Sequence, residues 1–224
     1  MYFDPTYFIY ILPGFILAVI AQIWISSAFN KYSKLSSGSN MTGQEAAQRI
    51  KEGERFLVDI VIQGEKLSDH FDPSKNIVSL SVASLEDSVA SVAVVAHEFG
   101  HVQQKFSNSL LFNIRTGLVP VVNIGSRLGY ILIILGLILN LLNLAQIGLI
   151  LFALTTVFAL VTLPIEIDAS KKAFQLIRKY KLIQESRIDG AKSVLSAAAT
   201  TYIASLLTSL LNVLYYASLI RRRG

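Results

Sequence analysis

Long apolar stretches alternate with polar segments along the chain. Residues 7–29 form the first stretch, residues 117–164 the second and residues 193–220 the last. The second stretch is long enough for two membrane crossings, because one crossing takes about 20 apolar residues, and it breaks most naturally at 139–146. The pattern therefore predicts about four transmembrane helices, over 7–29, 118–140, 145–164 and 193–220.

The polar residues 30–116 carry the signals of a small α+β region. Residues 42–45 read TGQE, the form of a capping box, and predict a short helix that ends at Gly53. Residues 55–62 and 77–82 alternate apolar and polar positions, as strands with one buried face do. We expect these strands to pair as a β-hairpin across a turn-rich loop, and an exposed strand edge there could hold a peptide.

Composition supports a membrane protein. Hydrophobic residues make up 53% of the chain and charged residues 16%, below the roughly 25% usual for soluble domains. The absence of cysteine excludes disulfides and thiolate metal ligands, which leaves His, Asp and Glu for any metal. The net charge is +5, but no basic patch is interleaved with aromatic residues, so we expect no nucleic-acid partner.

The charge distribution predicts the topology. Lys31 and Lys34 follow the first apolar stretch and no basic residue precedes it, which puts the N-terminus outside and residues 30–116 in the cytoplasm. A signal peptide cleaved near residues 26–28 is the alternative, and the missing N-terminal basic residues disfavour it. The predicted fold class is a mainly α membrane protein with about four transmembrane helices and a small cytoplasmic α+β domain. Residues 165–192 are expected to form a second cytoplasmic segment, a helix.

Residues 97–101 read HEFGH, an H-E-x-x-H motif in a chain with 3 histidines. The motif falls in the second half of a predicted helix of about five turns that begins at Ser84, the expected N-cap. Positions four apart share a helix face, so both imidazoles can bind one metal ion, and Glu98 can take a proton from a water bound there. Gly100 leaves room for substrate or for a packed backbone. Two exposed histidines on a helix are the simpler alternative.

Two histidines leave a zinc ion short of a protein ligand. Glu166 is the best candidate, because it is distant in sequence and is expected to open a helix where the membrane hairpin returns to the cytoplasmic surface. An acid in the first turn, stabilised by the helix dipole, is the alternative. His70 could donate to the oxyanion formed during peptide attack, or could be a loop histidine bonded to Asp69 or Asp72.

The sequence resembles the YugP-like family of bacterial membrane zinc metallopeptidases, which are distant relatives of the HtpX-type gluzincins. The resemblance covers nearly the whole chain and rests on TGQEAAQRI, LSDHFDPSKNIVSLS, AVVAHEFGHVQQ, LPIEIDASKKA and GAKSVLSAAATTYIA. It implies that His97, His101 and Glu166 bind one zinc ion and that Glu98 is the general base. The wider HtpX pattern has an acid four residues after the ligand Glu, whereas Ser170 stands there in this chain. Asp168 is therefore a weaker candidate for an orienting carboxylate.

The leading functional hypothesis is a zinc endopeptidase anchored in the bacterial cytoplasmic membrane, with peptides or proteins, membrane proteins among them, as substrates. A site-2-type intramembrane protease would take its third ligand from Asp189 in residues 187–190. That alternative is disfavoured because only about eight apolar residues precede the H-E-x-x-H motif, too few to span. A catalytically silent scaffold that keeps zinc for stability is the third hypothesis, and Glu98 argues against it because a structural site needs no base.

Overall fold

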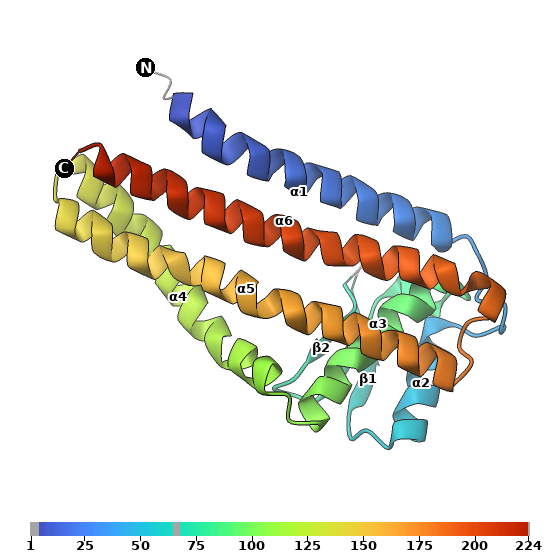
Figure 1. The fold of residues 1–224 in the computed structure, drawn as a ribbon. Helices are drawn as coiled ribbons and strands as arrows, with labels where there is room; N and C mark the ends of the chain where they lie inside the picture. The colour runs from blue at the N-terminus through green and yellow to red at the C-terminus, as the bar shows by residue number, and fades with distance from the viewer. Residues whose placement is uncertain (1–4, 65–67, 224) are drawn as a thin grey trace. The chain divides into compact units, whose positions relative to one another are not determined.

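The computed structural model describes residues 5–64 and 68–223, and helices dominate it (Figure 1). The elements follow the order α1 (Pro5–Tyr32), α2 (Gly43–Glu54), β1 (Asp59–Ile62), β2 (His70–Asp72), β3 (Ile77–Leu80), the 3-10 helix η1 (Val82–Leu85), α3 (Val89–Phe106), α4 (Leu110–Ile138), α5 (Leu142–Lys179), the 3-10 helix η2 (Glu185–Arg187) and α6 (Ile188–Arg221).

The chain forms two compact units, and all four long helices, α1, α4, α5 and α6, contribute residues to both. One unit comprises the described residues up to Gln22, Ile114–Pro164 and those from Thr200 onward. The other comprises Ile23–Asn113 and Ile165–Ala199. The second unit therefore holds the H-E-x-x-H motif, the sheet and Glu166 together.

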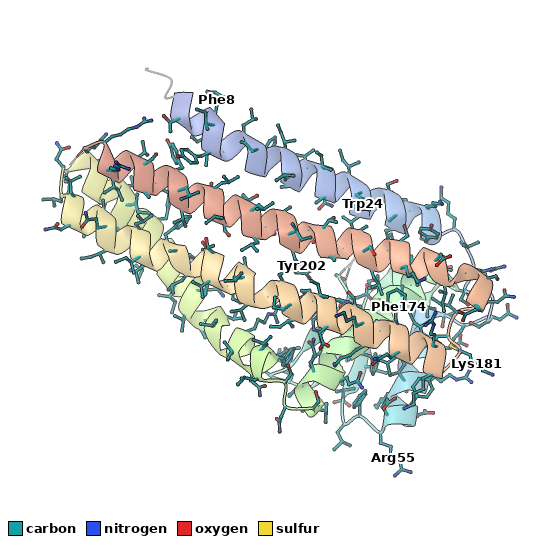
Figure 2. All side chains as sticks on the ribbon, in the orientation of Figure 1. Phe8, Trp24, Arg55, Phe174, Lys181 and Tyr202 are labelled. Atoms are coloured by element: carbon teal, nitrogen blue, oxygen red, sulfur yellow. The ribbon has the colours of Figure 1, made fainter. Side chains whose placement is uncertain are left out.

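The first unit is built from apolar helices. Within the described residues, four helices are long and apolar enough to cross a membrane, which confirms the predicted number: Thr6–Tyr32, Leu110–Ile138, Leu142–Lys179 and Glu185–Arg221. Their outward faces carry large apolar side chains, such as Phe8 on α1 (Figure 2). Helices α4 and α5 approach closely at Gly129, where an added Cβ would lie 2.6 Å from the backbone nitrogen of Phe152. Small residues permit such close contact between membrane helices.

The connection between α4 and α5 is tighter than the predicted break at 139–146. Only three residues separate the helices, and Asn140 adopts a left-handed conformation with φ 54°. The amide of Leu141 donates to the carbonyl of Gly136 at 2.8 Å, which closes the end of α4.

Pro164 does not end a helix, contrary to the sequence-based expectation. Helix α5 continues through it from Leu142 to Lys179, so Glu166 lies in the helix interior and not in a first turn. The alternative of an acid favoured by the helix dipole is therefore wrong. Proline removes one helical hydrogen bond, a loss that membrane helices tolerate when neighbouring groups satisfy the freed backbone. Residues 165–192 accordingly comprise the end of α5, a turn, η2 and the start of α6.

Helix α2 has the predicted capping box. The Thr42 hydroxyl accepts from the Glu45 amide at 3.1 Å, and the Glu45 carboxylate accepts from the Thr42 amide at 2.8 Å. The predicted stop at Gly53 is wrong, because the helix continues to Glu54 and Arg55 caps it with φ 56°. Arg55 projects from this end (Figure 2). Gly53 instead makes room for the ring of Tyr180, which an added Cβ would meet at 2.4 Å.

The sheet has three strands in the order β1-β3-β2, so the predicted hairpin between 55–62 and 77–82 is wrong. Strand β1 pairs with β3 in parallel, Asp59 opposite Ile77. The hairpin instead joins β2 to β3, and β2 lies in the segment between residues 62 and 77 that was predicted to be a loop. Asp72 makes the turn by accepting from the Ser74 amide at 2.8 Å. Residues 65–67 of that segment lie outside the described residues.

Helix α3 carries residues 97–101 and begins four residues later than expected. Ser88 is its N-cap and accepts from the Ser91 amide at 3.1 Å. Ser84 lies in η1, where its hydroxyl donates to Asp69 at 2.5 Å and cannot cap α3. The buried residues of this helix recur at helical spacing: Val89, Val92, Ala93, Ala96, Phe99 and Gly100.

Candidate metal centre

His97 and His101 lie one helical turn apart on α3. Their ring centroids are 4.9 Å apart, with the ring planes at 84°. The side chains are 13% and 12% exposed, so both rings are largely enclosed, unlike two histidines on an open surface. The ring nitrogens are therefore placed to meet a group on a neighbouring element.

Glu166 on α5 supplies that group. Its Oε2 atom lies 3.1 Å from Nε2 of His97 and 3.4 Å from Nε2 of His101. One ligand atom from each of the three residues lies within 4.8 Å of the others. Gly100 makes this approach possible, because a Cβ at that position would lie 2.4 Å from the carbonyl oxygen of Ala169 on α5. The space beside Gly100 is therefore occupied by packed backbone.

This donor set suits a zinc ion. Zinc bonds to imidazole nitrogen and carboxylate oxygen are about 2.0–2.2 Å long, so ligand atoms around a tetrahedral ion are roughly 3.3–3.5 Å apart. The distances of 3.1 and 3.4 Å from Glu166 to the two histidines are close to that spacing. Three protein ligands and one open position are typical of catalytic zinc sites, whereas structural sites fill all four.

Glu98 lies between the histidines in sequence and is buried, 9% exposed. Its Oε2 atom accepts a hydrogen bond from the backbone amide of Phe71, in strand β2, at 2.9 Å. Burial raises the pKa of the Glu98 carboxyl, although the nearby His101 and His97 oppose this shift. The side chain is thus held in place and is readier than an exposed glutamate to take up a proton.

Burial disfavours the charged form of His101, but the hydrogen bond and the negative charge of Glu166 outweigh it and raise the pKa of the ring. Metal binding requires the neutral ring, so a metal ion competes with a proton at this position.

Two polar side chains contact the outer nitrogens of the histidines. Gln104 lies 2.9 Å from Nδ1 of His101, and Ser170 lies 3.3 Å from Nδ1 of His97. Asp168, the sequence-based candidate for an orienting carboxylate, contacts Gln104 at 2.8 Å and not a histidine. Sequence reasoning missed Gln104. Its position three residues after His101, on the same helix face, was the available signal.

The structure does not bring His70 into the cluster of His97, His101 and Glu166. His70 is exposed on β2, and its Nδ1 lies 2.8 Å from the carbonyl oxygen of Ser68. The suggested partners have other contacts: Asp69 accepts from Ser81 and Ser84, and Asp72 accepts from Ser74.

Asp189, the third ligand of a site-2-type site, is also elsewhere. It forms an ion pair with Lys192 at 2.9 Å, with 90% of its side chain exposed. This carboxylate therefore belongs to a solvated surface at the start of α6.

Comparison with known proteins identifies the family. A sequence model of the family described as "Putative neutral zinc metallopeptidase" matches residues 7–221. The chain belongs to this family. It is also 37% identical over 203 residues to the "Putative membrane protease YugP" of Bacillus subtilis (strain 168), covering 89% of this chain and 90% of that protein. No solved structure matches. The chain thus combines membership of a zinc metallopeptidase family with four helices that are long and apolar enough to cross a membrane.

Proposed function

We propose that the protein is a membrane-anchored, zinc-dependent endopeptidase in which His97, His101 and Glu166 hold one zinc ion and Glu98 is the general base. The observation that carries the proposal is the meeting of these three side chains beside a buried glutamate. Bound zinc would activate a water for attack on the peptide bond and polarise the peptide carbonyl.

Glu98 is suited to the proton-transfer role by its hydrogen bond. The Phe71 amide engages Oε2, which leaves Oε1 to accept a proton from the attacking water. The amide also fixes the rotation of the carboxylate, since a backbone group in a sheet cannot move independently. Glu98 would return the proton to the leaving amine.

Strand β2 offers a place for a peptide substrate. It is an edge strand of the sheet, and its Phe71 amide contacts Glu98. A peptide added along this edge would therefore run past the general base and present its carbonyl groups there. We infer that substrates are peptides or proteins in an extended conformation, membrane proteins among them.

We place the site on the cytoplasmic face of the bacterial cytoplasmic membrane. Lys31 and Lys34 follow the first span, and Lys171, Lys172 and Arg178 lie near the end of α5. Basic residues beside membrane helices favour the cytoplasm. The same argument supports the proposed organisation of the chain. Segments 30–116 and 165–192 would be cytoplasmic, and segments 7–29, 117–164 and 193–220 would lie in the membrane.

A cleavage assay tests the proposal. Detergent-purified protein loaded with zinc should hydrolyse casein, and Glu98→Gln should keep zinc but lose about 10²–10⁴-fold in rate, because an amide cannot take the proton. Glu86→Gln, an exposed glutamate just before α3, is the matched control and should cleave normally. Cleavage retained by Glu98→Gln would contradict the general-base role. Zinc bound without cleavage by the wild type would favour the silent scaffold.

A further inference from the structure

We infer that Gln104 is a positioning residue, which holds the His101 ring in the tautomer that can bind metal and ties it to the segment of α5 that carries Glu166. The inference rests on the proposed zinc site and goes beyond it, because Gln104 touches neither the reacting atoms nor the ion. Gln104 is 1% exposed, so its amide can be satisfied only by protein groups or trapped water.

The partners of Gln104 determine which way its amide points. Nε2 lies 2.8 Å from the carbonyl oxygen of Ile165 and 2.8 Å from Oδ2 of Asp168. Both partners only accept hydrogen bonds, so the atom facing them must be the NH2 group, and its two hydrogens are both used. The carbonyl oxygen Oε1 therefore faces His101, 2.9 Å from Nδ1.

This orientation fixes the histidine as well. Oε1 of Gln104 can only accept, so Nδ1 of His101 must carry a hydrogen and donate it. In the neutral ring, Nε2 is then the unprotonated nitrogen, and Nε2 is the atom that faces Glu166 at 3.4 Å. A metal ligand needs that free lone pair.

Gln104 also connects the two ligand-bearing helices. It lies on α3, whereas Ile165 immediately precedes Glu166 on α5 and Asp168 follows it by two residues. Lys172 pairs with Asp168 at 3.0 Å and balances the charge of this carboxylate. The corresponding nitrogen of His97, Nδ1, has a longer contact, 3.3 Å, with the hydroxyl of Ser170. The support of the two histidines is thus unequal, with His101 the more firmly held.

Gln104→Met removes all three hydrogen bonds while keeping a side chain of similar length. We expect zinc affinity, measured by competition with a chelator, to fall about 10–100-fold, the range for losing a group that orients a metal ligand. Gln103→Met is the matched control, because the Oε1 atom of Gln103 is buried without a hydrogen-bond partner among the described residues. That variant should bind zinc as the wild type does.

A second pair of variants tests the direction of the hydrogen bond. Gln104→Glu places a carboxylate against Asp168 and should lose zinc affinity to a similar extent. Adding Asp168→Asn supplies an NH2 donor to Glu at position 104 and should recover part of the loss, whereas the carbonyl of Ile165 still lacks its donor. The double variant moves the negative charge from position 168, where it pairs with Lys172, to position 104. This comparison keeps the inference testable if Gln104→Met does not fold.

The outcomes separate this inference from the proposed function. A wild type that binds no zinc would contradict the proposed function itself. Wild-type zinc binding with equal affinity in Gln104→Met and Gln103→Met would overturn the role of Gln104 alone. If metal-free Gln104→Met has a lower Tm but unchanged zinc affinity, Gln104 acts only in packing, and its positioning role is overturned as well. Equal losses in Gln104→Glu and in the double variant would contradict the hydrogen-bond direction.

Discussion

Adding one methyl group at Gly100 should damage the metal centre without touching a ligand. Gly100 lies between the two histidines on α3, and its Cα faces the backbone of α5. The Cβ of Gly100→Ala would lie 2.4 Å from the carbonyl oxygen of Ala169 and 3.0 Å from the carbonyl carbon. Both atoms belong to a helix backbone, which cannot rotate away as a flexible side chain could.

The size of the effect follows from these distances. Ordinary contacts between such atoms are about 3.5 Å, so α3 and this part of α5 must separate by roughly 1 Å. Zinc–ligand distances tolerate about 0.2 Å, so Glu166 could no longer bind together with both histidines. We expect zinc affinity to fall at least about 10-fold. Overpacking of this kind also costs about 1–3 kcal/mol of stability.

The assay compares Gly100→Ala with Gly117→Ala in detergent, measuring zinc per chain by elemental analysis and Tm by intrinsic fluorescence. Gly117 lies in α4, and nothing is within 4 Å of a Cβ added there. That variant should keep full zinc and match or slightly exceed the wild-type Tm, since alanine favours helix. A Gly100→Ala protein with wild-type zinc content and Tm would refute the reasoning.

Three further predictions concern pH, topology and metal removal. Burial opposes ionisation of Asp87, but hydrogen bonds from Ser37 and Ser36 outweigh it and hold its pKa below the ordinary 3.8. That stabilisation exists above about pH 4 and is lost as the pH falls through the lowered pKa. Asp87→Asn should therefore lower the free energy of unfolding by about 2 kcal/mol at pH 7, seen as a lower Tm, and should match the wild type in acid. An Asp87→Asn deficit independent of pH would contradict this. In intact cells, Leu35→Cys should resist a membrane-impermeant thiol reagent and Asn143→Cys should react; the reverse pattern would invert the topology. Zinc at 100 times its Kd should add about 2.7 kcal/mol to the free energy of unfolding, so removing it with a chelator should lower Tm. An unchanged Tm would argue against bound metal.

The sequence was most informative where chemistry requires a local spacing. The interval from His97 to His101 is one helical turn, and the structure places both rings on one side of α3. The capping box of Thr42 and Glu45 is likewise local, and it formed as expected. Three apolar stretches, the second of them long enough for two crossings, predicted four helices, because the length of a membrane crossing is fixed by the bilayer.

The errors arose where distant parts of the chain decide the outcome. Proline propensity predicted a break at Pro164, but contacts such as that of Gln104 with Ile165 accompany a continuous α5. Alternation predicted a strand at 77–82, observed at 77–80, but gave no sign of β2, the strand that forms the hairpin with it. Gln104 was overlooked because a polar residue in a helix is more often at the surface, and two of its three partners, Ile165 and Asp168, are more than 60 residues away.

The metal content of Glu166→Ala tests the central claim most directly. The account predicts that purified Glu166→Ala retains little or no zinc, because it loses the carboxylate by which α5 contacts both histidines. Asp168→Ala should bind zinc more weakly, by about 10-fold, since it acts only through Gln104, and Asp189→Ala should bind normally. Full zinc occupancy in Glu166→Ala would contradict the proposed centre, and zinc loss confined to Asp189→Ala would instead favour the site-2-type arrangement.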